Sequence, residues 1–286
     1  MTSAGQLTTP RLLPCRDRQI VVGGEPLIVG VLNVTPDSFF DGGKFTVLES
    51  ALAQAQRMVI DGAAMLDIGG QSTRPGHEEI SDEEEIARVI PVLEAFAPRS
   101  SVPLSIDTYK PAVARAALRA GAHVLNDIHG LQRSPELAEV AAEFGCPVIV
   151  MHNDVAFPEF AGDPIQSIKR FFAASLEIAA RSGISRERVI LDPGIGFAKT
   201  PEQNLAIMGR LAELKCVGCP LLLGASRKST IGRVLGGLPP EERLEGTLAT
   251  TVLAVWQEVD FIRVHDVQAN LRAAQMAYAI RQASSR

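Results

Sequence analysis

The chain has 286 residues, of which 46% are hydrophobic and 21% charged, with 24 glycines and 18 prolines spread along it, so its composition is globular and excludes a disordered or low-complexity protein. The formal net charge of −5 argues against a nucleic-acid partner, and the absence of ~18 consecutive uncharged apolar residues argues against a membrane span. The length suits a single α/β barrel of roughly 250 residues, although it would also accommodate two smaller domains.

The N-terminal segment and the cysteines point to a cytoplasmic protein. Residues 1–24 are polar and lack the apolar core of a signal peptide. Cys15 and Cys146 are isolated, while Cys216 and Cys219 form a single C-x-x-C without the second pair that a zinc site needs. We therefore expect unreactive thiols rather than a metal or redox centre.

Residues 1–25 are predicted to form an extension, with a short hairpin around Gly23 and Gly24 that lies across the bottom of the following domain. From residue 26 to residue 286, short apolar runs alternate with longer amphipathic stretches, which is typical of βαβ units and a parallel sheet. In chain order, the predicted strand and helix pairs are 27–33 with 47–61, 64–69 with 82–96, 103–107 with 111–120, 123–126 with 135–144, 147–151 with 164–181, 189–192 with 201–214, 220–224 with 230–256, and 261–264 with 267–282.

Eight such pairs favour a single-domain (β/α)8 TIM barrel, because closure of the barrel removes the exposed sheet edges. The alternative is an open, doubly wound sheet. Such a sheet is expected to carry a G-x-G-x-x-G fingerprint after its first strand, and the segment from Gly30 to Asn33 does not supply one.

Nearly every predicted strand ends in a polar side chain. In a parallel barrel the carboxyl ends of the strands carry the catalytic groups, so we expect these side chains to converge on one concave face. The polar residues at the strand ends are Asn33, Asp67, Asp107, Asn126, His152, Asp192, Ser226 to Lys228, Arg263 and His265.

Three of these residues suit a flat heterocycle. Asp107 and Asp192 offer carboxylate acceptors, and Asn126 offers an amide that both accepts and donates. A pterin or a purine presents several N–H donors along one edge and would use all three.

A second group suits an anion. Arg263, Lys228 and His265 supply cations that can hold phosphate oxygens, and Asn33 could reach a Mg²⁺ ion that neutralises a pyrophosphate. Ser229 lies at the predicted start of a helix, where backbone N–H groups can bind a carboxylate. Two glycine-containing loops, 33–43 and 69–77, are plausible lids over this face.

Together these residues form a pattern that resembles dihydropteroate synthase. The resemblance extends from about residue 27 to the end of the chain, in the family's order and at barrel spacing. It is carried by NVTPDSFFDGG at 33–43, DIGGQSTRPG at 67–76, SID at 105–107, LND at 125–127, LDPGIGF at 191–197, SRKS at 226–229 and RVHD at 263–266.

The resemblance implies a transferase that joins 6-hydroxymethyl-7,8-dihydropterin diphosphate to 4-aminobenzoate, with a homodimer formed through the last helices. Four catalytic residues are implied, namely Asp107, Lys228, Arg263 and His265. The pterin site is implied to contain Asp107, Asn126, Asp192, Lys228 and Arg263. The diphosphate and its Mg²⁺ are implied to be held by Asn33, Arg263 and His265. The 4-aminobenzoate site is implied to contain Phe39, Thr73, Arg74, Pro75 and Ser229.

Some positions depart from the family pattern. The segment 153–158 replaces a loop that usually contains Gly and Met, so no role is assigned to it, and Gln71 stands where Glu is frequent. His129 and His152 are interpreted as structural residues or as supports for the site, and His77 and His123 as surface residues. The alternatives are a pterin-dependent methyltransferase, a pterin-binding paralogue without turnover, and a phosphate-binding barrel of other metabolism.

Overall fold

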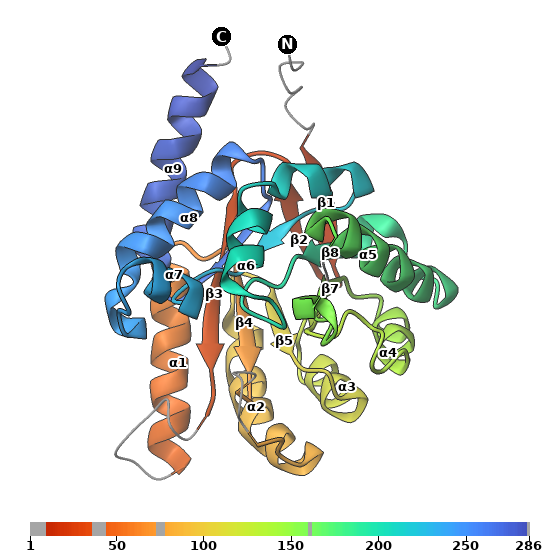
Figure 1. The fold of residues 1–286 in the computed structure, drawn as a ribbon. Helices are drawn as coiled ribbons and strands as arrows, with labels where there is room; N and C mark the ends of the chain where they lie inside the picture. The colour runs from red at the N-terminus through yellow and green to blue at the C-terminus, as the bar shows by residue number, and fades with distance from the viewer. Residues whose placement is uncertain (1–9, 36–43, 73–77, 160–161, 285–286) are drawn as a thin grey trace.

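The structure is a computed structural model that describes residues 10–35, 44–72, 78–159 and 162–284. Eight parallel strands form a nearly closed barrel surrounded by helices, as the sequence predicts (Figure 1). The strand order is β8-β7-β6-β5-β4-β3-β10-β9, and a parallel bridge between Leu191 and Leu221 links the two outer strands. The strands are β3 (Leu27–Asn33), β4 (Met65–Gly69), β5 (Leu104–Asp107), β6 (Val124–Asp127), β7 (Val148–Met151), β8 (Val189–Asp192), β9 (Leu222–Leu223) and β10 (Phe261–Val264).

The helices pack on the outer surface of the barrel. Their starts follow local chemistry: Ser81 accepts a hydrogen bond from the Glu84 N–H at the start of α2, and Thr200 and Gln203 form a capping box on α6. No helix of the described segments is long and apolar enough to cross a membrane. The helices are α1 (Lys44–Ile60), α2 (Asp82–Phe96), α3 (Pro111–Arg119), α4 (Glu136–Phe144), α5 (Pro164–Arg181), α6 (Pro201–Met208), α7 (Ser229–Val234), α8 (Leu244–Trp256) and α9 (Val267–Ser284).

The helix predicted over 230–256 is wrong, because the structure contains two helices there. The segment between α7 and α8 carries Gly236 and Gly237, whose φ angles are +82° and +93°, and then Pro239 and Pro240. Positive φ ends a helix at glycine, and proline cannot continue it. The break places Lys228 and Ser229 at the start of a short helix rather than on a long one.

An antiparallel hairpin of β1 (Arg11–Cys15) and β2 (Arg18–Val22) closes the bottom of the barrel. Its turn is formed by Arg16 and Asp17, so the expected position at Gly23 and Gly24 is wrong. Arg16 has a φ of +60°, and its guanidinium donates to the carbonyls of Leu118 and Ala122 at the end of α3. Favourable bonds at a helix C-terminus, rather than glycine, therefore fix this turn.

The hairpin and the barrel strands enclose an apolar core at the bottom of the barrel. Alternate hairpin residues point inward and pack on the first inward-facing layer of the strands. The cluster contains Leu13, Cys15, Ile20, Val22, Val29, Met65, Val124, Ile149, Ile190, Leu222 and Phe261. This packed layer leaves the opposite, carboxyl end of the barrel for a site.

Candidate functional site

Arg263 ties together the strand ends on one side of the barrel. From β10, its Nε donates to Asp67 Oδ2 on β4 over 2.6 Å, and its Nη2 donates to Asp107 Oδ2 on β5 over 2.8 Å. Asn126 on β6 donates from Nδ2 to the same Asp67 oxygen over 2.9 Å. The structure thus brings together three sequence-predicted site residues and adds Asp67, whose strand-end position the sequence indicated without a role.

This cluster holds more negative charge than Arg263 neutralises. Burial, together with the nearby Asp67 carboxylate, raises the pKa of Asp107 above its usual range. The Oδ1 atoms of Asp67 and Asp107 are buried and have no hydrogen-bond partner within the described residues. Buried acceptors without donors are costly, so the cluster is suited to a ligand that brings N–H groups or positive charge.

Asp192 lies at the end of β8, where the following turn fixes its carboxylate. The Gly194 N–H donates to Asp192 Oδ1 over 2.7 Å, and burial raises the pKa of this carboxyl group. A Cβ placed on Gly224, in the next loop, would lie 3.6 Å from Asp192 Oδ2 and 3.9 Å from the Arg263 side chain. The glycine therefore leaves room for an atom in contact with both side chains, a feature that only the fold reveals.

Lys228 and Phe197 form the neighbouring wall. The Lys228 Nζ lies 4.0 Å from the centre of the Phe197 ring, which is a cation–π contact. Phe197 packs against a small apolar cluster of Tyr109, Ile128 and Met151. Phe197 ends the LDPGIGF motif at 191–197, but the sequence alone predicts no role for it, because its position depends on this packing.

His265 is held by Ser226. The Ser226 Oγ lies 3.0 Å from His265 Nδ1 and accepts a hydrogen bond from the His265 N–H over 3.2 Å. Arg227, between Ser226 and Lys228, has a φ of +58° and is fixed by an ion pair of 2.7 Å with Asp266. The loops after β9 and β10 are thus coupled, and each carries one of the predicted cations.

Asn33, at the end of β3, faces the acidic cluster. A Cβ placed on Gly69 would lie 3.8 Å from both Asn33 Oδ1 and Asp107 Oδ2. Two hard oxygen donors therefore border one small space, and this fits Mg²⁺, which takes few protein oxygens when it also binds phosphates. No group of three acidic, His or Cys side chains that could form a complete metal cage occurs in the described ranges.

The predicted 4-aminobenzoate residues are only partly described. Ser229 is exposed at the start of α7, next to Lys228. Four others, Phe39, Thr73, Arg74 and Pro75, lie outside the described residues, as does His77.

Two predictions about the histidines have different outcomes. His123 is buried, with 3% of its surface exposed, so its prediction as a surface residue is wrong; its Nδ1 accepts a hydrogen bond from Leu104 N–H. His152 is fully buried between the rings of Phe157 and Phe171. That packing agrees with a structural or supporting role.

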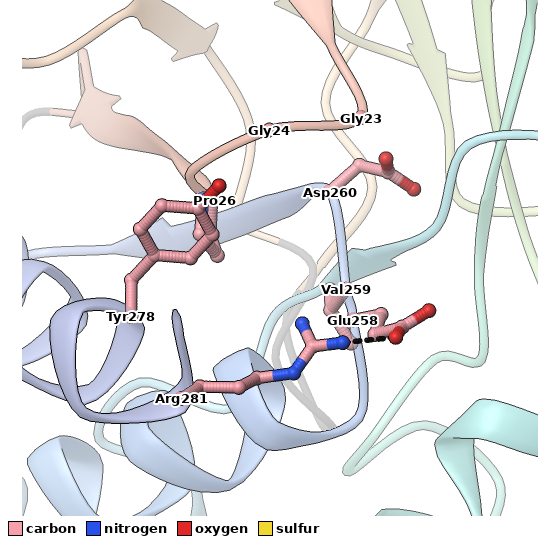
Figure 2. Close-up of a pocket in the computed structure, with 8 residues that line it drawn as sticks. All are labelled: Gly23, Gly24, Pro26, Glu258, Val259, Asp260, Tyr278 and Arg281. Carbon is pink, nitrogen blue, oxygen red and sulfur yellow. Dashed lines mark hydrogen bonds and ion pairs between the residues drawn. The ribbon is translucent and has the colours of Figure 1, made fainter. Parts of the chain in front are cut away.

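A crevice at the other end of the barrel is too small to compete as a substrate site. It lies between the Gly23–Gly24 segment, Asp260 and helix α9, and Figure 2 shows Arg281 paired with Glu258 at its edge. Its volume is about 10 Å³, which is the space of one water molecule. This crevice therefore does not rival the carboxyl end as a candidate active site.

The comparisons with known proteins show which proteins this chain resembles. A family model described as pterin binding enzyme matches residues 29–265. The chain is 48% identical over 260 residues to a dihydropteroate synthase of Bacillus subtilis, covering 89% of this chain and 88% of the relative. It is 44% identical over 259 residues to that of Escherichia coli, covering 89% and 91%.

The similar solved structures are also dihydropteroate synthases. A dihydropteroate synthase of Xanthomonas albilineans, determined with 4-aminobenzoic acid, is similar with a TM-score of 0.90 at 39% identity, covering 95% of this chain and 98% of that chain. The enzyme of Clostridium difficile, determined in the presence of pteroic acid, has a TM-score of 0.87 at 48% identity, covering 91% and 98%.

Proposed function

Since the chain belongs to the dihydropteroate synthase family and is a transferase of folate biosynthesis, we propose how its side chains perform the reaction. The substrates are 6-hydroxymethyl-7,8-dihydropterin diphosphate and 4-aminobenzoate, and the products are 7,8-dihydropteroate and diphosphate. The observation that carries the assignment of roles is the acidic cluster around Arg263, in which two buried carboxylate oxygens have no donor among the described residues.

Recognition of the pterin rests on three acceptors and two cations. Asp192, fixed by the Gly194 N–H, receives the N–H and amino edge of the ring, while Asn126 and Asp107 meet its other polar atoms. Arg263 lies against the ring, beside the room left by the missing side chain of Gly224. Lys228 donates to the pterin from the neighbouring wall, where the Phe197 ring contacts its ammonium.

The diphosphate is gripped by Asn33, Arg263 and His265. The guanidinium and the imidazole donate to phosphate oxygens, and the contact between Ser226 and His265 Nδ1 orients the imidazole. Asn33 Oδ1 would hold a Mg²⁺ ion, whose charge would lower the energy of the departing diphosphate. The side chains that hold Arg263 and His265 in place therefore fix the position of the leaving group.

The reaction follows a dissociative course. The bond between the pterin methylene carbon and the diphosphate oxygen breaks first, and the electron pair leaves with the diphosphate. The neutral aniline nitrogen then attacks the cationic methylene, forms the C–N bond and loses one proton. Asp107 stabilises the cation electrostatically, because a buried carboxylate aimed at developing positive charge lowers the barrier.

The second substrate is assigned the residues that the family resemblance implies. Phe39, Thr73, Arg74 and Pro75 would contact the ring of 4-aminobenzoate, and Ser229 would receive its carboxylate. Ser229 supports this role because it is exposed beside Lys228, so a molecule bound there lies next to the pterin site.

The enzyme is a cytoplasmic homodimer in which residues 26–286 form the catalytic domain and residues 1–25 an extension. Exposed apolar side chains on α8 and α9 support the dimer; they are Val252 (37% exposed), Trp256 (48%), Met276 (63%) and Ile280 (46%). Leu253 and Tyr278 instead pack against the core. The buried free thiols of Cys15, Cys146 and Cys219 fit a reducing compartment.

Diphosphate release tests the function. The purified protein is incubated with Mg²⁺ and the dihydropterin diphosphate, with and without 4-aminobenzoate, and the variants Lys228→Ala and Arg263→Ala are compared with Lys215→Ala. Lys215 bonds Glu258 at the bottom of the barrel and serves as the control. We expect release that depends on 4-aminobenzoate, formation of dihydropteroate, and loss of turnover in the first two variants alone. Pterin binding without product would indicate a non-catalytic paralogue.

A further inference from the structure

Lys199 joins three backbone carbonyls next to the wall formed by Phe197 and Lys228, called the pterin wall below. Its Nζ donates to the carbonyls of His152 over 3.1 Å, Gly194 over 2.9 Å and Phe197 over 3.0 Å. The first carbonyl follows β7, and the other two belong to the loop between β8 and α6. An ammonium group has three donors and no acceptor, so these three bonds use all of its hydrogens.

The backbone of Gly194 lies very close to the backbone that follows β7. Gly194 has a φ of +68°, and a Cβ placed on it would lie only 2.1 Å from the His152 carbonyl oxygen. The three carbonyl oxygens that accept hydrogen bonds from Lys199 would repel one another if no donor lay between them. A charged donor therefore stabilises an arrangement of the loop that the peptide groups alone would oppose.

The same loop positions the pterin wall. Gly194 donates to the Asp192 carboxylate, and the Phe197 ring lies 4.0 Å from Lys228 Nζ. A Cβ on Gly196 would lie 3.0 Å from the Lys228 side chain, so the loop also limits where that lysine can lie. A shift of the loop would move all three groups together.

We propose that Lys199 is a positioning residue for the pterin half of the site. Its ammonium holds the loop 193–198 in the arrangement in which Asp192, Phe197 and Lys228 meet the heterocycle. Lys199 acts through these residues and does not touch the substrate. This role rests on the proposed pterin site, and it leaves the 4-aminobenzoate half unaffected.

The surroundings of Lys199 make this tie sensitive to pH. Burial lowers the pKa of Lys199 to about 7; Asp192 and Asp154 oppose this shift, and Lys228 reinforces it. The His152 imidazole is buried beside it, and burial lowers the pKa of that imidazole to about 3, so it carries no charge near neutrality. The ammonium and its three bonds are therefore present below about pH 7, and one bond is lost as the pH rises.

The test compares the affinity for 6-hydroxymethylpterin, measured by titration calorimetry between pH 6 and pH 9, in the wild type, Lys199→Met and Lys215→Met. At pH 6 we expect Lys199→Met to bind about tenfold more weakly, since methionine removes all three bonds and tenfold corresponds to roughly the net value of one of them. The difference should shrink above pH 7, where the wild type also loses the ammonium. Lys215→Met should follow the wild type throughout.

Two further readouts separate positioning from folding. Lys199→Arg cannot lose its charge in this range, so the alkaline fall in affinity should be reduced in it even if Lys199→Met unfolds. The KM for 4-aminobenzoate should stay near the wild-type value in both variants. Wild-type affinity at pH 6 in Lys199→Met, or an equal loss at every pH, would overturn the positioning role. A wild type that binds no pterin would overturn the proposed function as well.

Discussion

Replacement of Asp107 by asparagine should stabilise the free protein while it slows turnover strongly. Asp107 and Asp67 share one guanidinium, and each has a buried oxygen without a partner among the described residues. An uncompensated buried charge costs several kcal/mol, and the amide gives up about 1 kcal/mol of the charge-assisted bond from Arg263. Because the Asp107 side chain is 12% exposed, we expect a net gain of about 1–2 kcal/mol at pH 8.

Thermal unfolding and single-turnover kinetics measure the two effects. At roughly 2–4 °C per kcal/mol for a large domain, the unfolding midpoint of Asp107→Asn should rise by about 2–8 °C at pH 8. A carboxyl group with a raised pKa binds its proton more tightly in the folded state, so this gain should shrink as the pH falls through that pKa and the wild type is protonated. The single-turnover rate should fall by about 10²–10³-fold. A near-wild-type rate would refute the electrostatic role, and a lower midpoint at pH 8 would refute the charge argument.

Three further predictions concern residues around the cluster. Lys110 forms an ion pair of 3.0 Å with the buried Glu85 carboxylate, and Lys110→Met removes this cation. The free energy of unfolding, measured by denaturant titration, should fall by about 3–5 kcal/mol and should recover in the double variant with Glu85→Met. Burial lowers the pKa of His152 to about 3, so the unfolded chain binds the proton first and the wild type loses stability below about pH 6.5; His152→Leu should lessen the difference in unfolding midpoint between pH 7.5 and pH 5. Ser229→Ala should raise the KM for 4-aminobenzoate about tenfold without changing that for the dihydropterin diphosphate, and equal changes in both would contradict its contact with the carboxylate.

The strands could be predicted because each is a short buried run with a clear stop. The bounds of β3, β8 and β10 agree with the sequence to the residue, since β3 and β8 end in the polar residues Asn33 and Asp192, and His265 follows β10. The helix predicted over 230–256 failed for a reason that was present in the sequence. Two glycines and two prolines interrupt it, but apolar residues on both sides suggested a continuous helix.

The site could be predicted only as a set of strand-end side chains. Asp67 was recognised as polar, but its pairing with Arg263 joins residues 196 positions apart, and no local pattern contains that contact. Gly224 and Lys199 depend even more on the fold. One matters for the side chain it lacks, and the other for three carbonyls that meet only in the closed barrel.

In the proposed mechanism, the excess of negative charge around Arg263 favours the reaction intermediate over the substrate. While the diphosphate is attached, Arg263 can divide its donors between Asp67, Asp107 and the phosphate oxygens, and the pterin is neutral. Once the diphosphate departs, a positive methylene appears next to carboxylates that one guanidinium does not neutralise. The electrostatic cost stored in the free protein is then relieved at the moment when the cation forms. Interactions that strengthen only at that point accelerate the chemical step, whereas a fully neutralised site would bind substrate and intermediate alike.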